Sequence, residues 1–110
     1  MNQGVVRVTL GGRLDMEAAL ELEDPFTFQI ATQRAPVVVD LSAVDFLASI
    51  GMRLLVKNAK AQQGRGGKLV LYKPTDLVRE ALTVSGIATI IPVYDDLEQA
   101  CQSALTGMTA

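Results

Sequence analysis

A chain of 110 residues with 49% hydrophobic and 20% charged residues is typical of one globular domain with a single core. Its one cysteine, Cys101, excludes an internal disulfide, and the absence of histidine removes the usual general base and zinc ligand. The net charge of −2 and the 5% aromatic content give neither a basic stripe nor a stacking platform for nucleic acid. No apolar run is long enough to span a membrane, and residues 1–3 lack the basic start of a signal peptide. We therefore predict a single cytoplasmic domain over residues 1–110, with its core at about residues 5–105.

The beginning of the chain predicts a strand followed by a helix. Residues 5–10 are rich in valine and lead to Gly11-Gly12, where we expect the strand to end. Asp15 is placed to cap the next helix. Apolar residues at helical spacing predict the inward side of this helix, namely Met16, Ala19, Leu20 and Leu22. Pro25 interrupts the pattern, so we expect the helix to pause there and then to resume.

Two apolar runs predict strands that are buried on both faces of a parallel sheet: residues 37–41, which are apolar around Asp40, and residues 68–72, which are apolar after Lys68. Asp40 would lie near the carboxyl end of the first, and the chain would then turn at Ser42-Ala43. A second helix is expected to begin at about Ser49. Glycines end this helix and stop it before the second run, at Gly64, Gly66 and Gly67.

The last third of the chain repeats the alternation. Thr75 or Asp76 can cap a third helix that ends at Gly86. Residues 90–93 predict a last strand, which Pro92 restricts to an edge of the sheet.

A final helix is predicted from the capping pair Asp95 and Glu98 to about Leu105, with Cys101 on its inner face. Strands and helices therefore alternate along the whole chain with short connections. This order predicts a small α/β domain with a mainly parallel sheet of four to five strands and right-handed crossovers.

Ser49 carries a hydroxyl at the start of the second helix, where free backbone N–H groups and the helix dipole favour a phosphate. At about 100° per residue, three cationic side chains share the face of Ser49, and two apolar ones lie at its margin. The predicted partner-binding surface consists of Ala48, Ser49, Ile50, Met52, Arg53, Val56, Lys57 and Lys60. The alternatives are a serine that only caps the helix and cations that are merely solvated. Gly51 is interpreted as a residue that lets helix and sheet approach closely.

The chain resembles the STAS domain, the module of bacterial anti-sigma factor antagonists, in the order Asp40-Leu41-Ser42, Val44, Phe46-Leu47, Ala48-Ser49-Ile50-Gly51-Met52. The glycines at 64–67, the following LVLY and the run VSGI at 84–87 fit the same plan. This resemblance implies a non-enzymatic module that binds an anti-sigma factor, itself a serine kinase with a histidine-kinase-like fold, and thereby frees a sigma factor. It also implies that the kinase phosphorylates Ser49 and that a PP2C-type phosphatase removes the phosphate.

The chain departs from the family pattern at two positions. Relatives commonly carry an aspartate before the phosphorylated serine and a hydroxyl residue after it, where this chain has Ala48 and Ile50. Both changes remove polar groups that a kinase or phosphatase could read. A first strand found in many relatives is also not evident, which predicts an exposed sheet edge or a homodimer that covers it.

Three other interpretations stay open. STAS-like subunits also serve as scaffolds in lipid-transport and stress-signalling assemblies, and Ala48 and Ile50 favour such a scaffold without a working switch. A receiver-like domain would take phosphate on Asp40, with Lys73 at a strand end, but the acidic pair for magnesium is missing. An enzyme would need acidic residues at the carboxyl ends of the strands, such as Asp15, Asp40, Asp45 and Asp95. Because neither a base nor a cofactor loop accompanies these carboxylates, we predict no catalytic residue, no cofactor and no metal.

Overall fold

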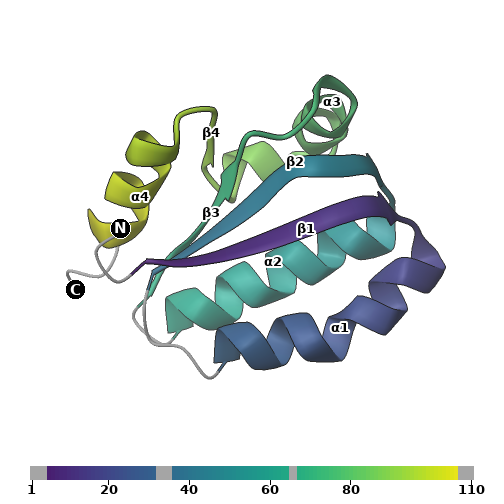
Figure 1. Cartoon of the computed structure of the whole chain (residues 1–110), viewed down its shortest axis with the longest axis horizontal. Coiled ribbons are helices and arrows are strands. Elements are labelled where there is room, and N and C mark those ends of the chain that lie inside the picture. Colours follow the sequence, from purple (N-terminus) through teal and green to yellow (C-terminus); the bar gives the residue numbers. More distant parts are fainter. Residues whose placement is uncertain (1–4, 32–35, 65–66, 107–110) are drawn as a thin grey trace.

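The computed structural model describes residues 5–31, 36–64 and 67–106. Helices and strands alternate along these ranges (Figure 1), in the order β1 (Val6–Leu14), α1 (Met16–Ala31), β2 (Val37–Leu47), α2 (Ser49–Gly64), β3 (Leu69–Tyr72), α3 (Asp76–Val84), a 3-10 helix (Ile87–Thr89), β4 (Val93–Tyr94) and α4 (Leu97–Thr106). The strands form one parallel sheet in the order β1-β2-β3-β4. The predicted α/β architecture is confirmed. Gly66, one of the glycines expected to end the second helix, lies outside the described residues.

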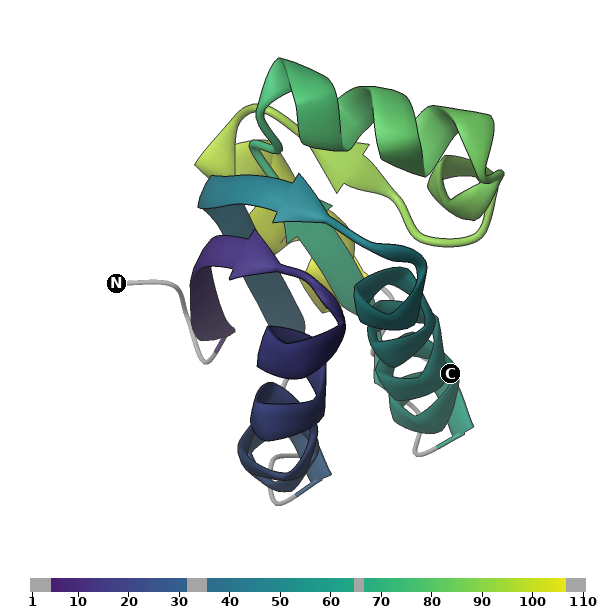
Figure 2. The same cartoon turned by 90° about the vertical axis from the view of Figure 1, so that its right-hand side faces the viewer.

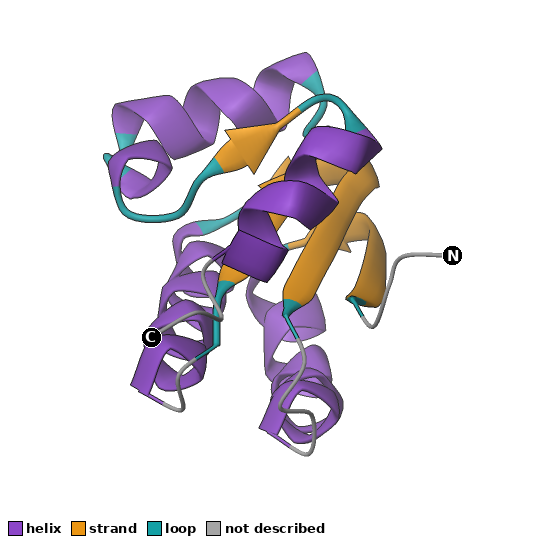
Figure 3. Ribbon diagram, turned by 90° about the vertical axis from the view of Figure 1, so that its left-hand side faces the viewer, coloured by secondary structure: helices purple, strands orange, loops and turns teal. Residues whose placement is uncertain are grey.

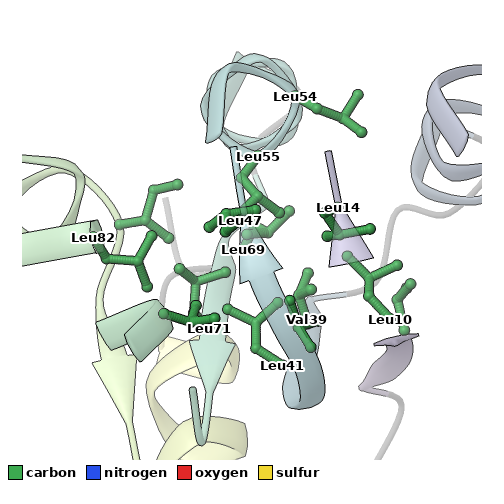
Figure 4. Packing of buried hydrophobic residues seen from close by; sticks show 14 of the residues in the cluster. Leu10, Leu14, Val39, Leu41, Leu47, Leu54, Leu55, Leu69, Leu71 and Leu82 are labelled. Atoms are coloured by element: carbon green, nitrogen blue, oxygen red, sulfur yellow. The ribbon is translucent and has the colours of Figure 1, made fainter. Parts of the chain in front are cut away.

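The sheet separates two layers of helices. Figure 1 and Figure 2 show α1 and α2 side by side against one face, and Figure 3 shows α4 on the opposite face. The main core lies between the sheet and α1, α2 and α3, and Figure 4 shows Leu47, Leu55 and Leu69 gathered between α2 and the sheet. A smaller core joins β2 and β3 to α4 and includes Cys101, which confirms the predicted inner position of this residue. The apolar run at the start of β2 is buried on both faces, as predicted.

Strands β1 and β2 are both longer than predicted. The pairing continues through Gly11-Gly12 and through Ser42-Ala43, with irregularities in register between Thr9 and Gly11 and between Gly12 and Arg13. Gly12 has φ +75°, which a glycine adopts without strain. These irregularities let residues that do not alternate strictly stay in one strand. Asp40 consequently lies in the first half of β2 and not near its carboxyl end, so that prediction is wrong.

Helix α1 does not pause at Pro25 but continues from Met16 to Ala31. The proline removes one backbone hydrogen bond, yet the next residue, Phe26, is only 1% exposed in the main core. Burial of this ring in the main core favours a continuous helix over a break. The predicted apolar side of α1 is wrong at two positions, because Met16 and Leu20 are exposed.

The caps of the last two helices differ in how well they were predicted. The side chain of Thr75 accepts a hydrogen bond from the N–H of Val78, which confirms it as the cap of α3. Helix α4 is capped by Asp96, not by Asp95, since Asp96 Oδ1 accepts the N–H of Glu98 at 2.8 Å. The predicted strand at residues 90–93 is shorter than expected, and β4 comprises only Val93–Tyr94 at an edge of the sheet.

Candidate functional site

Ser49 is the first residue of α2, and its side chain is exposed. The carbonyl of Ala48 accepts the N–H of Met52 at 3.0 Å, so Ala48, and not Ser49, holds the N-cap position. The interpretation of Ser49 as the helix cap is therefore wrong. Within the described ranges the hydroxyl of Ser49 makes no hydrogen bond, and the methyl group of Ala48 cannot accept one from the first turn.

The start of α2 is held in place by the ends of β1 and β2. The N–H of Ala48 donates to the carbonyl of Leu14 at 2.9 Å. A Cβ atom at Gly51 would lie 2.9 Å from Leu47 Cδ1 and 3.4 Å from the carbonyl oxygen of Leu14. The glycine thus allows the helix to approach the sheet closely, as its position suggested, and this approach places Ser49 at the carboxyl edge of the strands.

Helix α2 has an inward side of small, apolar and amide residues and an outward side of cations. Its buried residues are Gly51, Leu54, Leu55, Asn58 and Gln62. Arg53, Lys57 and Lys60 are exposed, and Met52 and Val56 are half-buried against the main core. The structure brings Ala48, Ser49, Ile50 and Arg53 together at the helix start. Lys60 follows Ser49 by eleven residues, about 16 Å along the helix axis, and so lies apart from this group.

Two apolar residues beside this surface were assigned to the core by the sequence pattern. Met16 is 63% and Leu20 is 56% exposed, and both belong to α1, which packs beside α2. The apolar stripe predicted for α1 covers about 160° of the helix, wider than one buried side requires. This width is the signal that could have placed part of the stripe on the surface.

Asp40 lies in a hydrogen-bonded cluster on the sheet face that α4 partly covers. Its side chain is almost fully buried and accepts hydrogen bonds from Arg7 Nη2 at 2.6 Å and from Ser42 Oγ at 2.7 Å. Burial alone would raise the pKa of Asp40, but the bonds from Arg7 and Ser42 outweigh it and hold this pKa below its ordinary value. A carboxylate enclosed in this way is not open to a phosphate donor, which speaks against the receiver-like interpretation.

Two of the other aspartates named for an enzyme, Asp15 and Asp95, have partners of their own. Asp15 Oδ1 accepts the N–H of Ala18 at 3.0 Å, which confirms it as the cap of α1. Asp95 pairs instead with Arg79. In the described part of the chain, no group of three or more acidic, cysteine or histidine side chains could hold a metal ion. None of the described helices is long and apolar enough to cross a bilayer.

Replacing Ala48 by aspartate is expected to raise the free energy of unfolding by about 0.5–2 kcal/mol, because a carboxylate at the N-cap accepts an N–H of the first turn. Urea denaturation measures the change. The variant Ala48→Asn supplies the same hydrogen bond without the charge and so separates capping from the dipole term. A lower midpoint for both variants would contradict the N-cap assignment.

Comparison with known proteins shows which family and which related proteins this chain is similar to. The STAS domain model matches residues 1–100. BtrV of Bordetella bronchiseptica, assigned as an anti-sigma factor antagonist, is 30% identical over 96% of this chain and 90% of its own. RsfB, an anti-sigma-F factor antagonist of Mycobacterium tuberculosis, is 27% identical over 97% of this chain and 84% of its own. The unphosphorylated anti-sigma factor antagonist SpoIIAA matches with a TM-score of 0.75 at 20% identity, over 96% of this chain and 91% of that chain. Phosphorylated SpoIIAA of Bacillus matches with a TM-score of 0.65 at 19% identity, over 91% and 90%.

Proposed function

This chain belongs to the STAS domain family, and on that premise we propose that it is an anti-sigma factor antagonist whose binding is switched off by phosphorylation of Ser49. The partner is an anti-sigma factor that is also a serine kinase, and its capture by this chain frees a sigma factor. A PP2C-type phosphatase reverses the modification. The names of BtrV and RsfB support this function. The observation that carries the proposal is the exposed hydroxyl of Ser49 at the start of α2.

The proposed phosphorylation needs little chemistry from this chain. Ser49 Oγ attacks the γ-phosphorus of ATP held by the kinase, ADP leaves, and the hydroxyl proton passes to a base of the kinase. This chain has no histidine to serve as that base. Its contribution is an accessible hydroxyl at a helix start, where the uncapped N–H groups stabilise the phosphate that forms.

The phosphate acts through charge and does not require refolding. It adds about −1.5 to −2 charges to a surface that the partner would cover. Enclosing such a group in an interface carries a desolvation cost of several kcal/mol. Arg53 lies one helical turn after Ser49 on the exposed side, so the phosphate also competes with the partner for this cation.

The proposal is tested with recombinant histidine-kinase-like serine kinases from the same genome and radiolabelled ATP. One of these kinases is expected to label the chain once, at Ser49, and Ser49→Ala is expected to stay unlabelled. Ser85→Ala, which removes an exposed hydroxyl at the end of α3, is the matched control and keeps full labelling. Label that resists hydroxylamine is phosphoserine and not an acyl phosphate on Asp40. Equal labelling of Ser49→Ala and the parent contradicts the switch, and copurification with a transporter ATPase or a large multiprotein particle would favour the scaffold instead.

A further inference from the structure

One row of side chains on α1 faces α2. Two members of this row contact α2 directly: Glu23 pairs with Lys57 at 3.0 Å, and Thr27 Oγ1 lies 3.4 Å from the amide nitrogen of Asn58. Residues three or four positions apart lie on one side of a helix. The same row therefore continues toward the start of the helix with Leu20 and Met16, the two exposed apolar residues of this end.

Between the two helices lies an open groove of about 220 Å³, lined by Ala19, Glu23, Ile50, Arg53, Leu54 and Lys57. Ala19 and Leu54 are nearly fully buried and form its apolar floor. Arg53 and Lys57 line it from α2. The side-by-side packing of α1 and α2 that forms the groove is visible in Figure 2.

The charges along this groove are unequal. Along this groove α2 contributes the cations Arg53 and Lys57 and no acidic residue, and α1 contributes one carboxylate, Glu23, so the lining is cationic although the chain as a whole has a net charge of −2. Glu23 balances Lys57, which leaves Arg53 with no ion-pair partner among the residues that the structure describes. Charge complementarity therefore favours an occupant that presents apolar side chains between carboxylates.

We infer that this groove, together with Met16 and Leu20, is the second half of the partner-binding surface and receives an acidic amphipathic helix of the anti-sigma factor. The identity of the partner rests on the proposed function. An apolar side chain of that helix enters the groove and covers Leu20, and a carboxylate beside it pairs with Arg53. Arg53 then lies beside both the groove and Ser49. A phosphate on Ser49 competes for this cation and therefore also weakens binding of the partner helix in the groove.

The first test measures affinity for the kinase that labels Ser49. Leu20→Glu is expected to weaken binding by about tenfold or more. The new carboxylate would lie against an apolar side chain of the partner helix and close to the carboxylates of that helix. Val84→Glu changes an equally apolar side chain that is 82% exposed on α3, and it should bind as the parent does. Unchanged affinity of Leu20→Glu overturns the inference.

The second test needs no kinase. A synthetic helical peptide with leucines one turn apart between glutamates is titrated into the isotope-labelled chain and followed by NMR. Shifts are expected at the amides of Met16, Leu20, Ile50 and Arg53, and a twin peptide with lysines in place of the glutamates should cause none. Absence of these shifts, or equal shifts from both peptides, overturns the groove. If the peptide causes these shifts but no kinase labels Ser49, the phosphorylation switch is overturned and the binding groove is supported. If a kinase labels Ser49 but the peptide causes no shifts, the groove is overturned and the switch is supported.

Discussion

Replacing Ser49 by glutamate is expected to weaken binding of the anti-sigma factor kinase by about 100-fold or more. The side chain is exposed at the helix start, so the partner would have to cover a carboxylate that the free protein leaves in water. The same carboxylate lies in the first turn of α2, where the helix dipole stabilises it by about 0.3–1 kcal/mol. Stability should therefore rise slightly while affinity falls. Because stability and affinity are expected to change in opposite directions, a loss of affinity can be assigned to the interface and not to unfolding.

Isothermal titration measures the affinity, and urea denaturation measures the free energy of unfolding. Gln63→Glu is the matched control, since it adds the same charge to an exposed position near the other end of α2. Its affinity should stay within a few-fold of the parent. Ser49→Ala should bind the kinase as the parent does and resist inactivation by ATP. Tight binding by Ser49→Glu would contradict a switch that works through charge.

Much of the fold follows from two short stretches of sequence. The apolar runs at residues 37–41 and 68–72 predicted buried parallel strands, and the structure pairs them in register, Val37 with Leu69 and Val39 with Leu71. Few structures other than an interior parallel strand suit an apolar run of this kind, because side chains on both of its faces must be buried. Gly11-Gly12 was misread for the opposite reason. Glycines are typical of turns, and only pairing with β2 keeps these two in a strand.

The site was predictable where it depends on one helix and not where it depends on two. Helical periodicity within α2 separated the exposed Arg53 from the buried Leu55 correctly. The exposure of Leu20, by contrast, depends on where α2 begins relative to α1. That position is set by the hydrogen bond from Ala48 to Leu14, which joins distant parts of the chain. The width of the apolar stripe on α1 indicates that part of it is exposed, but local spacing does not say which part lies beside the start of α2, and so the groove was missed.

Replacing Arg7 by methionine is expected to lower the free energy of unfolding by about 1–3 kcal/mol at neutral pH. Asp40 is almost fully buried, and removal of Arg7 leaves its carboxylate with Ser42 as the remaining side-chain donor. The expected loss is smaller than for a fully buried pair, because the Arg7 side chain is 40% exposed and water can partly replace it. Methionine keeps most of the aliphatic stem that packs on the sheet.

The dependence on pH identifies the charge as the cause. In the parent the pKa of Asp40 is lower in the folded than in the unfolded state, so its stabilisation is present above the unfolded value of about 4 and is lost as the pH falls through the folded value. Without Arg7, burial is opposed only by Ser42, and the pKa of Asp40 rises. The difference between Arg7→Met and the parent should thus be largest at neutral pH and shrink as the pH falls below the ordinary value of about 4, because Asp40 takes up its proton at higher pH in the variant than in the parent. The double variant Arg7→Met, Asp40→Asn should recover part of the loss at neutral pH. A difference that does not change with pH would instead point to lost packing of Arg7 on the ring of Tyr72, which lies 5.6 Å from the guanidinium.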